Sequence, residues 1–249
     1  MTAGLKITQT NDVLRIGISV PDRRNALSRA MLREIRSTVD QSRDAHAVLL
    51  TGNHETFSAG ADLHELTGTA ADATFDDTLT AACEAIRATP VPVIAAIEGA
   101  CIGAAVELAL SCDMTIGGES AWLRVPAIRL GLLYNPRGIE RFHRRLDRAT
   151  ISRLLLFGLR CTASEAVRAG LLAEVVSTGT ALARAEQLAA ELPPAPRPAL
   201  AHTKELLAAL DEGRFDESHW QAIRTGLLES PERTSALAQA RQPSEAAGQ

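Results

Sequence analysis

The sequence has few cysteines, no excess of basic residues and no uninterrupted apolar run of membrane-spanning length. Its 249 residues carry a formal net charge of −4 at pH 7. An acidic chain has no long-range attraction for nucleic acid or for an anionic membrane surface. We therefore expect a protein that binds neither nucleic acid nor a membrane.

The longest apolar stretch, VPVIAAIEGACIGAAVELAL at 91–110, is long enough to be considered as a transmembrane helix. A span needs about 20 apolar residues, and this one would place Glu98 and Glu107 in hydrocarbon. The start of the sequence has no basic segment followed by an apolar one, so we expect no secretory signal. These features predict a soluble, cytoplasmic protein.

The four cysteines do not show the C-x-x-C spacing that is typical of redox and zinc sites. Three of them lie in apolar segments, where a reduced thiol packs as a small hydrophobic side chain. His54, Glu55, His64 and Glu65 lie near one another in the sequence, but no H-E-x-x-H or comparable ligand set occurs. We expect a reducing cytoplasm and no metal site.

Short apolar strands alternate with helical patterns over the first 180 residues. The pattern predicts strands at 13–20, 47–52, 92–99, 112–118, 121–126 and 171–176. Helices are expected after Ser28, a suitable N-cap, and after Thr162, which forms a capping box with Glu165. The stretch between residues 67 and 91 is polar and shows no clear pattern.

The composition changes near residue 193. The pattern before this point is mixed α/β, and beyond Thr180 it is helical apart from PPAPRP at 193–198, which suits a stiff linker. We expect an α/β core over residues 1–192 and a C-terminal helical module over residues 193–249.

Two turns of small residues follow buried strands and precede helices, one in FSAGADLHEL at 57–66 and one at 99–106. Such turns expose backbone N–H groups at a helix N-terminus. Because small side chains let a ligand carbonyl approach, two turns of this kind can hold one oxyanion between them. Glu107 follows the second turn among apolar neighbours, where an ionised carboxylate needs a partner.

Four motifs together resemble those of the crotonase superfamily, which includes enoyl-CoA hydratases and isomerases. They are PDRRNALS at 21–28, FSAGADL at 57–63, EGACIGAAVELALSCD at 98–113 and VPAIRLGLLYN at 125–135. The resemblance implies an α/β spiral of repeated ββα units with a C-terminal helical module that supports homotrimers, often paired into hexamers. It also implies an acyl-CoA substrate, with coenzyme A as part of that substrate and no other cofactor.

The resemblance assigns the N–H groups of an oxyanion hole to Ala61 and Ala104 and a catalytic carboxylate to Glu107. It places coenzyme A beside residues of the first two motifs: Arg23, Arg24, Ala26, Ala59, Asp62 and Leu63. A plainer interpretation of Glu107 is a glutamate that reaches solvent or pairs with an arginine. Asp62 would also suit the cap of a following helix.

The chain departs from the family's pattern at three places. Hydratases carry a second glutamate directly after the proline that here is Pro126, and this chain has Ala127. Since two carboxylates on one water assist its addition to a double bond, hydratase activity is left open. Ala104 replaces the usual glycine but keeps its N–H. Leu237 and Ala240 stand where an aromatic residue and a lysine often contact coenzyme A.

Tyr134 and Asn135 resemble the YN pair of a methylmalonyl-CoA decarboxylase branch, which also has HEL at the place of 64–66 but a histidine in place of Ala61. Decarboxylation needs an oxyanion hole and groups that orient a carboxylate. Three functions therefore stay open. We favour an enzyme of enoyl-CoA hydratase/isomerase type with Glu107 as its single acid/base. The alternatives are a decarboxylase that uses Tyr134 and an acyl-CoA-binding protein without catalysis.

Two further charged features have plain interpretations. The arginines of RGIERFHRRLDR at 137–148 predict a helix face that contacts solvent or another subunit. Glu98 precedes the glycine turn and suggests an ordinary charge at a strand end. No serine or cysteine has an identifiable base, so we expect no covalent acyl-enzyme.

Overall fold

The computed structural model describes residues 4–192 and 197–241 of the chain. The chain divides into two compact units, Met1–Glu191 and Leu192–Gln249. Most of the expected linker at 193–198 lies outside the described residues, and the first helix after it begins at Arg197. The second unit is helical, with α8 (Arg197–Asp211), α9 (Glu217–Leu228) and α10 (Pro231–Ala240).

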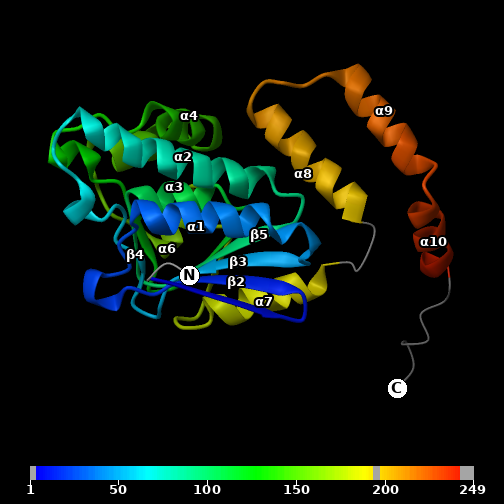
Figure 1. The fold of residues 1–249 in the computed structure, drawn as a ribbon, viewed down its shortest axis with the longest axis horizontal. Coiled ribbons are helices and arrows are strands. Elements are labelled where there is room, and N and C mark those ends of the chain that lie inside the picture. Colours follow the sequence, from blue (N-terminus) through cyan, green and yellow to red (C-terminus); the bar gives the residue numbers. More distant parts are fainter. Residues whose placement is uncertain (1–3, 193–196, 242–249) are drawn as a thin grey trace. The chain divides into compact units, whose positions relative to one another are not determined.

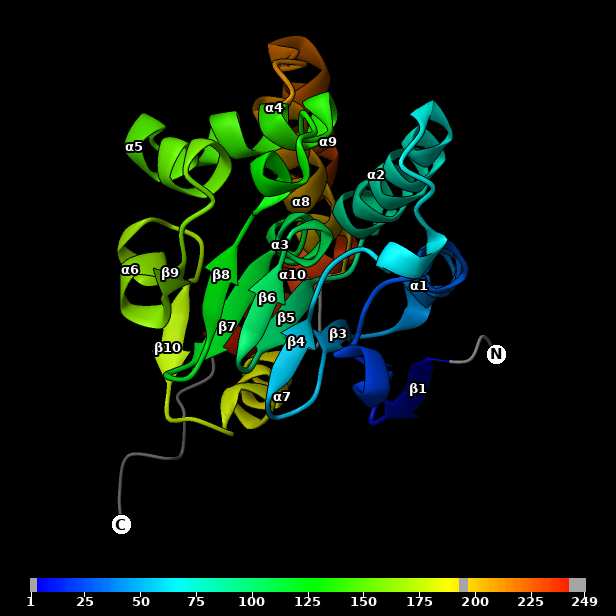
Figure 2. The ribbon, with the colours of Figure 1, turned by 90° about the vertical axis from the view of Figure 1, so that its left-hand side faces the viewer.

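Two sheets form the centre of the first unit (Figures 1 and 2). The six-stranded sheet has the order β1-β2-β3-β5-β7-β10, antiparallel between β1 and β2 and parallel from β2 to β10. Its strands are β1 (Leu5–Thr10), β2 (Val13–Ile18), β3 (Ala47–Thr51), β5 (Val93–Ile97), β7 (Met114–Gly118) and β10 (Glu174–Val176). The four-stranded sheet has the order β4-β6-β8-β9, parallel from β4 to β8. Its strands are β4 (Thr56–Ser58), β6 (Ala100–Ile102), β8 (Trp122–Arg124) and β9 (Cys161–Thr162).

After α1, three successive turns of the chain each add a strand to the larger sheet, then a strand to the smaller sheet, and then a helix. Thus β3 and β4 precede α2 (Ala73–Ala88), β5 and β6 precede α3 (Ala104–Leu110), and β7 and β8 precede α4 (Pro136–Arg145). This repetition confirms the expected spiral of ββα units. Figure 1 shows α1 and α3 on one side of the larger sheet and α7 on the other, where α7 contacts β3, β5 and β7.

The remaining helices of the first unit are α1 (Arg29–Asp40), α5 (Arg148–Ile151), α6 (Ala163–Arg168) and α7 (Ala181–Glu191). Short 3-10 and π segments connect the elements: η1 (Pro21–Arg23), η2 (Ser42–Asp44), η3 (Leu63–Glu65), η4 (Ala70–Asp72), η5 (Ala127–Leu130) and η6 (Ser152–Leu156). Both predicted helix starts are confirmed. Ser28 Oγ accepts a hydrogen bond from the N–H of Met31 at 3.1 Å, and Thr162 and Glu165 form the capping box of α6.

The stretch between residues 67 and 91, for which the sequence showed no clear pattern, contains α2. Phe75, Leu79, Ala82 and Ile86 are buried along this helix, and their spacing of three or four residues places them on one face. Alanine and threonine fill much of the remaining helix and dilute the apolar signal. The short strands β4, β6 and β9 were also missed, because two or three residues are too few to show alternation.

Glu98 is not an ordinary charge at a strand end, so that interpretation was wrong. Its side chain is buried and accepts hydrogen bonds from the N–H of Gly179 at 2.9 Å and of Ala181 at 3.1 Å. Ser120 Oγ donates a third bond at 3.1 Å. A carboxylate at this position satisfies N–H groups just before and at the start of α7, which have no partner within the helix. Glu98 therefore joins the end of β5 to the start of α7.

The four cysteines are free and buried, as expected for thiols that pack as small hydrophobic side chains: Cys83, Cys101, Cys112 and Cys161. Burial, with a smaller contribution from the charge of Glu107, raises the pKa of Cys83 to about 12. Within the part of the chain that the structure describes, no helix is both long and apolar enough to cross a bilayer. The same residues contain no group of three or more side chains suited to a metal ion.

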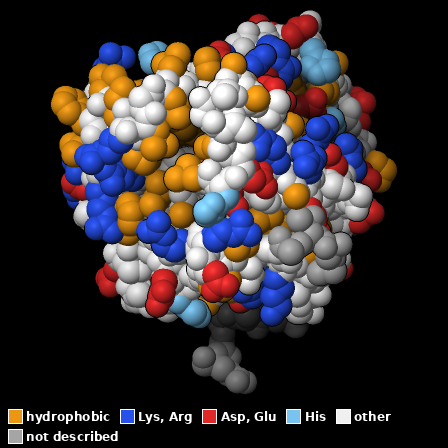
Figure 3. All heavy atoms as spheres, turned by 60° about the vertical axis from the view of Figure 1, so that its left-hand side comes forward, with side chains coloured by type: hydrophobic (Ala, Val, Ile, Leu, Met, Phe, Trp, Pro, Cys, Tyr) orange, Lys and Arg blue, Asp and Glu red, His pale blue; other side chains and the backbone are white. Residues whose placement is uncertain are grey.

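Large hydrophobic side chains are exposed on η5 and η6 and on the loops that follow them. They are Ile128, Leu130, Leu132, Leu133, Leu156, Phe157 and Leu159. The two segments contact each other. On the face drawn in Figure 3, hydrophobic side chains gather in a patch with Lys and Arg beside it. An exposed apolar surface of this kind is typical of a contact with another chain.

Candidate active site

The carboxyl ends of β4, β6 and β8 meet at one edge of the smaller sheet. Ser58 pairs with Cys101, and Ile102 pairs with Arg124, so the three strands end side by side. The turns that follow them are consequently neighbours. The N–H of Gly103 donates to the carbonyl oxygen of Arg124 at 2.8 Å, which joins the second turn to the third strand. Three of the four sequence motifs converge at this edge.

The fourth motif, residues 21–28, runs along the first of these turns. The N–H of Ala59 donates to the carbonyl oxygen of Arg24 at 2.9 Å. Asn25, which the sequence analysis did not single out, is buried and donates from Nδ2 to the carbonyl oxygen of Thr56 at 2.8 Å. The motif residue Asn25 thus attaches the segment to β4.

Backbone pairing with Leu27 decides where the N–H of Ala61 points. The N–H of Leu27 donates to Gly60 at 2.7 Å, and its carbonyl oxygen accepts from Asp62 at 2.9 Å. In such a parallel pair, the residue between the two bonded positions directs its own N–H and C=O away from the partner. Ala61 is that residue, so its N–H points away from Leu27.

The N–H groups of Ala61 and Ala104 are close neighbours. A Cβ placed on Gly60 would lie 3.4 Å from the backbone nitrogen of Ala104. Ala104 is the first residue of α3, where helical N–H groups have no intrahelical partner. Within the described residues, neither amide donates to a protein acceptor. The two turns therefore present a pair of free donors of the kind that can hold one oxyanion.

Glu107 lies one turn of α3 beyond Ala104, and only 1% of it is exposed. Both of its carboxylate oxygens have partners. Tyr134 Oη donates to Oε2 at 2.8 Å, and Arg141 Nη1 donates to Oε1 at 2.5 Å. Burial raises the pKa of Glu107, and the charge of Arg141 and the two hydrogen bonds oppose that rise. The plainer interpretation of Glu107, pairing with an arginine, is confirmed, and it does not exclude a chemical role.

Tyr134 reaches Glu107 from the loop before α4. Its Oη also lies 3.5 Å from the carbonyl oxygen of Gly103, and its ring stacks on Phe142 with 5.8 Å between the ring centroids. Burial, together with the adjacent negative charge of Glu107, raises the pKa of Tyr134 well above its usual value. The phenol therefore stays protonated near neutral pH and serves as a hydrogen-bond donor.

The prediction that the arginines of α4 contact solvent or another subunit was wrong for Arg141. Its side chain is 19% exposed and points inward to Glu107. Arg145 also donates to a backbone carbonyl of α3, whereas Arg144 pairs with an exposed glutamate of its own helix. The sequence signal that could have placed Arg141 is the pair Gly138 and Phe142, both buried, because residues three and four apart share a helix face.

Gly138 lets α4 pack directly against the carboxylate. A Cβ at this position would lie 2.5 Å from Glu107 Oε2 and 2.7 Å from Tyr134 Cε1. Both distances are far below ordinary van der Waals contact, and neither side chain is free to move away, because each is bonded to the other. The absence of a side chain at 138 is therefore a condition for the contact between Tyr134 and Glu107.

We expect Gly138→Ala to move α4 away from α3 and to lower the free energy of unfolding by about 1 kcal/mol. Alanine in a helix gains about 1 kcal/mol over glycine, but forcing extra atoms into a packed interior costs about 1–3 kcal/mol. Urea denaturation measures the difference. The matched control is Gly226→Ala on α9, where an added Cβ meets no atom within 4 Å and the alanine should stabilise. An equal effect of both changes would contradict the close contact.

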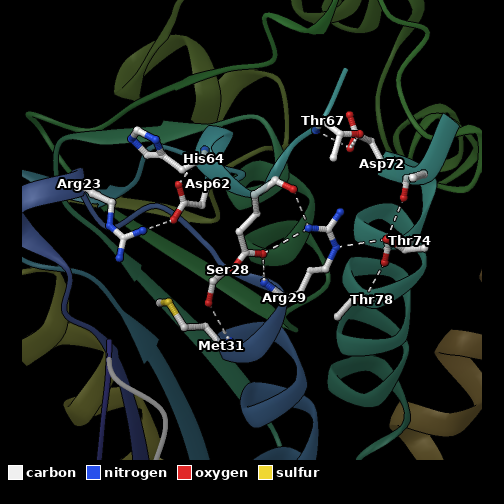
Figure 4. A network of polar contacts seen from close by, with 12 residues as sticks. Arg23, Ser28, Arg29, Met31, Asp62, His64, Thr67, Asp72, Thr74 and Thr78 are labelled. Carbon is white, nitrogen blue, oxygen red and sulfur yellow. Dashed lines mark hydrogen bonds and ion pairs between the residues drawn. The ribbon is translucent and has the colours of Figure 1, made fainter. Parts of the chain in front are cut away.

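The residues expected to contact coenzyme A gather around the first turn. Figure 4 shows Arg23 and Asp62 pointing toward each other, and their side chains form an ion pair. Asp62 is buried and also accepts from the N–H of His64 at 3.1 Å, so its expected role as a helix cap is confirmed for η3. The others lie in the same two segments: Arg24, Ala26, Ala59 and Leu63. Leu63 is 61% exposed. Their contact with coenzyme A stays a prediction.

A second ion pair, between Arg29 Nη1 and Glu65 Oε2 at 3.4 Å, fixes the chain after Asp62. Arg29 Nη1 also donates to the carbonyl oxygen of Glu65 at 2.9 Å, and the N–H of Arg29 donates to Glu65 Oε2 at 2.9 Å. Glu65 thus attaches η3 to the first turn of α1. His64 is exposed on η3.

Two departures from the family's pattern can be located. Ala127 is buried at the first position of η5, just beyond the end of β8. Leu237 and Ala240 lie on α10, where they help to line an apolar groove of about 380 Å³ within the second unit. The position after Pro126 therefore supplies no carboxylate, whereas Glu107 lies one turn of α3 beyond Ala104.

Comparison with known proteins gives a consistent result. The sequence model of the enoyl-CoA hydratase/isomerase family matches residues 8–236. The 2,3-dehydroadipyl-CoA hydratase of Escherichia coli is 31% identical over 247 residues, with 96% of this chain and 97% of that protein covered. A solved structure of Pseudomonas aeruginosa DspI has a TM-score of 0.89 at 28% identity and covers 97% of this chain and 96% of the other. An enoyl-CoA hydratase of Bacillus anthracis has a TM-score of 0.83 at 26% identity, covering 94% and 95%.

Proposed function

The chain belongs to the enoyl-CoA hydratase/isomerase family, and we propose that it holds an acyl-CoA thioester enolate between the N–H groups of Ala61 and Ala104. The observation that carries this proposal is the pair of neighbouring amides without protein acceptors, one turn of helix from a buried carboxylate. The thioester oxygen gains negative charge when a proton leaves the α-carbon. Two donors aimed at that oxygen stabilise the charge as it develops.

Glu107 is the group that moves the proton. As a carboxylate it takes a proton from the α-carbon of a 3-enoyl thioester, and the electron pair passes into a dienolate whose oxygen the two amides hold. The protonated Glu107 then returns the proton to the γ-carbon, which leaves a 2-enoyl thioester. One acid/base suffices for this shift. Addition of water is assisted by a second carboxylate, and the buried methyl group of Ala127 stands at that position. The site therefore favours isomerisation over hydration.

The test is a panel of coenzyme A thioesters assayed with the purified protein. Conversion of a 3-enoyl to a conjugated 2-enoyl thioester, followed by its ultraviolet absorbance, is the expected result. Hydration of the 2-enoyl product should be slower. Binding of acyl-CoA by calorimetry without turnover of any thioester would reject the enzyme and support an acyl-CoA-binding protein instead.

Ala127→Glu is expected to increase hydration of a 2-enoyl thioester by about tenfold or more, because general acid–base groups contribute about 10²–10⁴-fold. The change restores a second carboxylate at the first position of η5, where the helix start tolerates negative charge. Steady-state rates of hydration measure the gain. Ala127→Gln is the control for size and polarity. Equal rates for the Glu and Gln variants would show that a missing acid does not limit the native protein.

Decarboxylation of a malonyl-type thioester is a second candidate. It is favoured by the place of Tyr134, whose hydroxyl lies beside Glu107 and the carbonyl group of Gly103. Loss of CO₂ leaves the same enolate for the two amides to hold, and a phenol donor can orient the departing carboxylate. Release of CO₂ that disappears in Tyr134→Phe, without isomerisation by the native protein, would select this function.

The same proposal covers assembly and location. We expect a homotrimer or a hexamer of paired trimers, which the exposed apolar side chains of η5 and η6 support. A cytoplasmic location agrees with four free, buried thiols. Coenzyme A is expected only as part of the substrate, and no other cofactor is invoked.

A further inference from the structure

Arg141 lies against the carboxylate on which the proposed function depends. We propose that Arg141 is a positioning residue that keeps Glu107 ionised and oriented for proton transfer. This inference rests on the proposed function of Glu107. Arg141 belongs to none of the four motifs that identify the family, so its role follows from the contacts of this chain alone.

The contact between the two side chains is close and largely removed from water. Nη1 of Arg141 lies 2.5 Å from Oε1 of Glu107, with the arginine side chain 19% exposed and the glutamate side chain 1% exposed. Opposite charges attract more strongly in such surroundings than on a wet surface. An arginine stays charged at every pH at which a protein is folded. The guanidinium is therefore a permanent cation beside Glu107.

Arg141 and Tyr134 hold the carboxylate from two directions. Tyr134 bonds to Oε2 and Arg141 bonds to Oε1, so rotation of the carboxyl group would break one contact or the other. Gly138 lies between these two residues in the chain and brings α4 close enough for both bonds. Tyr134 orients the group without charge. Arg141 orients it and also compensates its charge.

The other ionisable groups around Glu107 do not compensate its charge. Burial raises the pKa of Glu107, and Asp76 on α2 raises it further. The pKa of Asp76 is itself raised, by burial and by the negative charges of Asp77 and Asp72. Cys83, also on α2, carries a neutral thiol, and Glu84 faces Arg141 with a further negative charge. Among the groups that shift the pKa of Glu107, the cation is Arg141.

Arg141→Met tests the charge while it keeps an unbranched side chain for packing. A nearby opposite charge lowers a carboxyl pKa by about 1–3 units, so its removal should raise the pKa of Glu107 by about 1 unit or more. A base with a higher pKa is protonated at neutral pH. The acid limb of the pH profile of kcat/KM should therefore move to higher pH. Activity at neutral pH should be lower by up to about tenfold for a shift of one unit, and it should recover as the pH increases. Arg141→Lys should restore part of the shift.

The matched control is Arg144→Met, which removes an exposed arginine three residues further along α4 and should leave the profile in place. Added guanidinium ion should rescue Arg141→Ala and have no effect on Arg144→Met. If Arg141→Met lowered activity equally at every pH, with no improvement in Arg141→Lys, Arg141 would be a structural residue and the inference would be wrong.

An infrared measurement decides the inference without turnover. At neutral pH, folded Arg141→Met should show the carbonyl band of a protonated carboxyl that the native protein does not show. The band should vanish when Glu107→Gln is added. If the native protein converts no thioester, the proposed function fails, and the band still reports whether Arg141 keeps Glu107 ionised. A folded Arg141→Met protein without this band would overturn the inference.

Discussion

Glu107→Gln is expected to lower kcat by about 10²–10⁴-fold for the thioester that the protein converts, the range that a positioned acid/base contributes. The amide keeps the size of the side chain and can still bond to Tyr134, but it cannot accept the proton from the α-carbon. KM should change little, because the thioester is held by the backbone amides. Steady-state kinetics across the panel of thioesters measures both constants.

The pH dependence of kcat/KM in the native protein provides a second test of Glu107 as the base. Glu107 must be ionised to act as a base, and burial raises its pKa. kcat/KM should therefore fall as the pH is lowered, and the fall should begin at a higher pH than an exposed glutamate would give. This acid limb should be absent from whatever activity Glu107→Gln retains.

The control for this change is Glu140→Gln, which removes an exposed carboxylate from α4 and should leave kcat unchanged. Glu107→Gln also leaves Arg141 without its counter-charge, so a thermal melt must show that the variant is folded. If Glu107→Gln unfolds, Glu107→Asp provides the second test. This change keeps the charge, but the shorter side chain moves the carboxylate away from its native position. Native kcat in a folded Glu107→Gln protein would exclude Glu107 from the chemistry.

Ala104→Pro is expected to lower kcat by about 10²–10³-fold, the loss found when one oxyanion-hole donor is removed. Proline has no backbone N–H, yet it is favoured at the first position of a helix, which is the place of Ala104 in α3. The preceding residue is Gly103, whose φ of 57° lies in a region that glycine adopts readily. The change therefore removes one donor with little effect on the helix. The measurement is kcat, with a melting curve for stability.

Glu217→Pro is the matched control. Glu217 is the first residue of α9. The side chain of the cap residue Asp216 accepts hydrogen bonds from the N–H groups of Ser218 and His219 and not from that of Glu217. Proline at this position should leave both kcat and stability near native values. A folded Ala104→Pro protein with native kcat would show that the N–H of Ala104 holds no charge in the transition state, and the proposed oxyanion hole would be lost.

The two halves of the candidate site differ in how far the sequence could predict them. The small residues around Gly60 and Gly103 were sufficient to predict turns with free N–H groups, although the strands that directly precede these turns, β4 and β6, were missed. That the two turns meet depends on the parallel pairing of β4 with β6. These strands are three residues long, and no periodicity in so short a segment specifies a partner.

The partners of the buried carboxylates could not be predicted from the sequence. Glu107 is adjacent in sequence to apolar residues only, and its cation lies 34 residues away on α4. Glu98 likewise finds its N–H donors 81 and 83 residues away. In both cases the sequence indicated a costly buried charge and could not identify what stabilises it. The arginine-rich segment at 137–148 shows the limit most clearly, because composition alone cannot separate inward-facing Arg141 from exposed Arg144.

By itself, the sequence determined the local features of this protein: its capped helices, its small-residue turns and the motifs that give its family. Each of these depends on residues within a few positions of one another, where backbone sterics and hydrogen bonding act directly. The tertiary structure alone decided which turns face each other and which cation stands beside Glu107. Those contacts join segments far apart in the chain, and they form only because the sheets and helices pack in one register and bury both partners together.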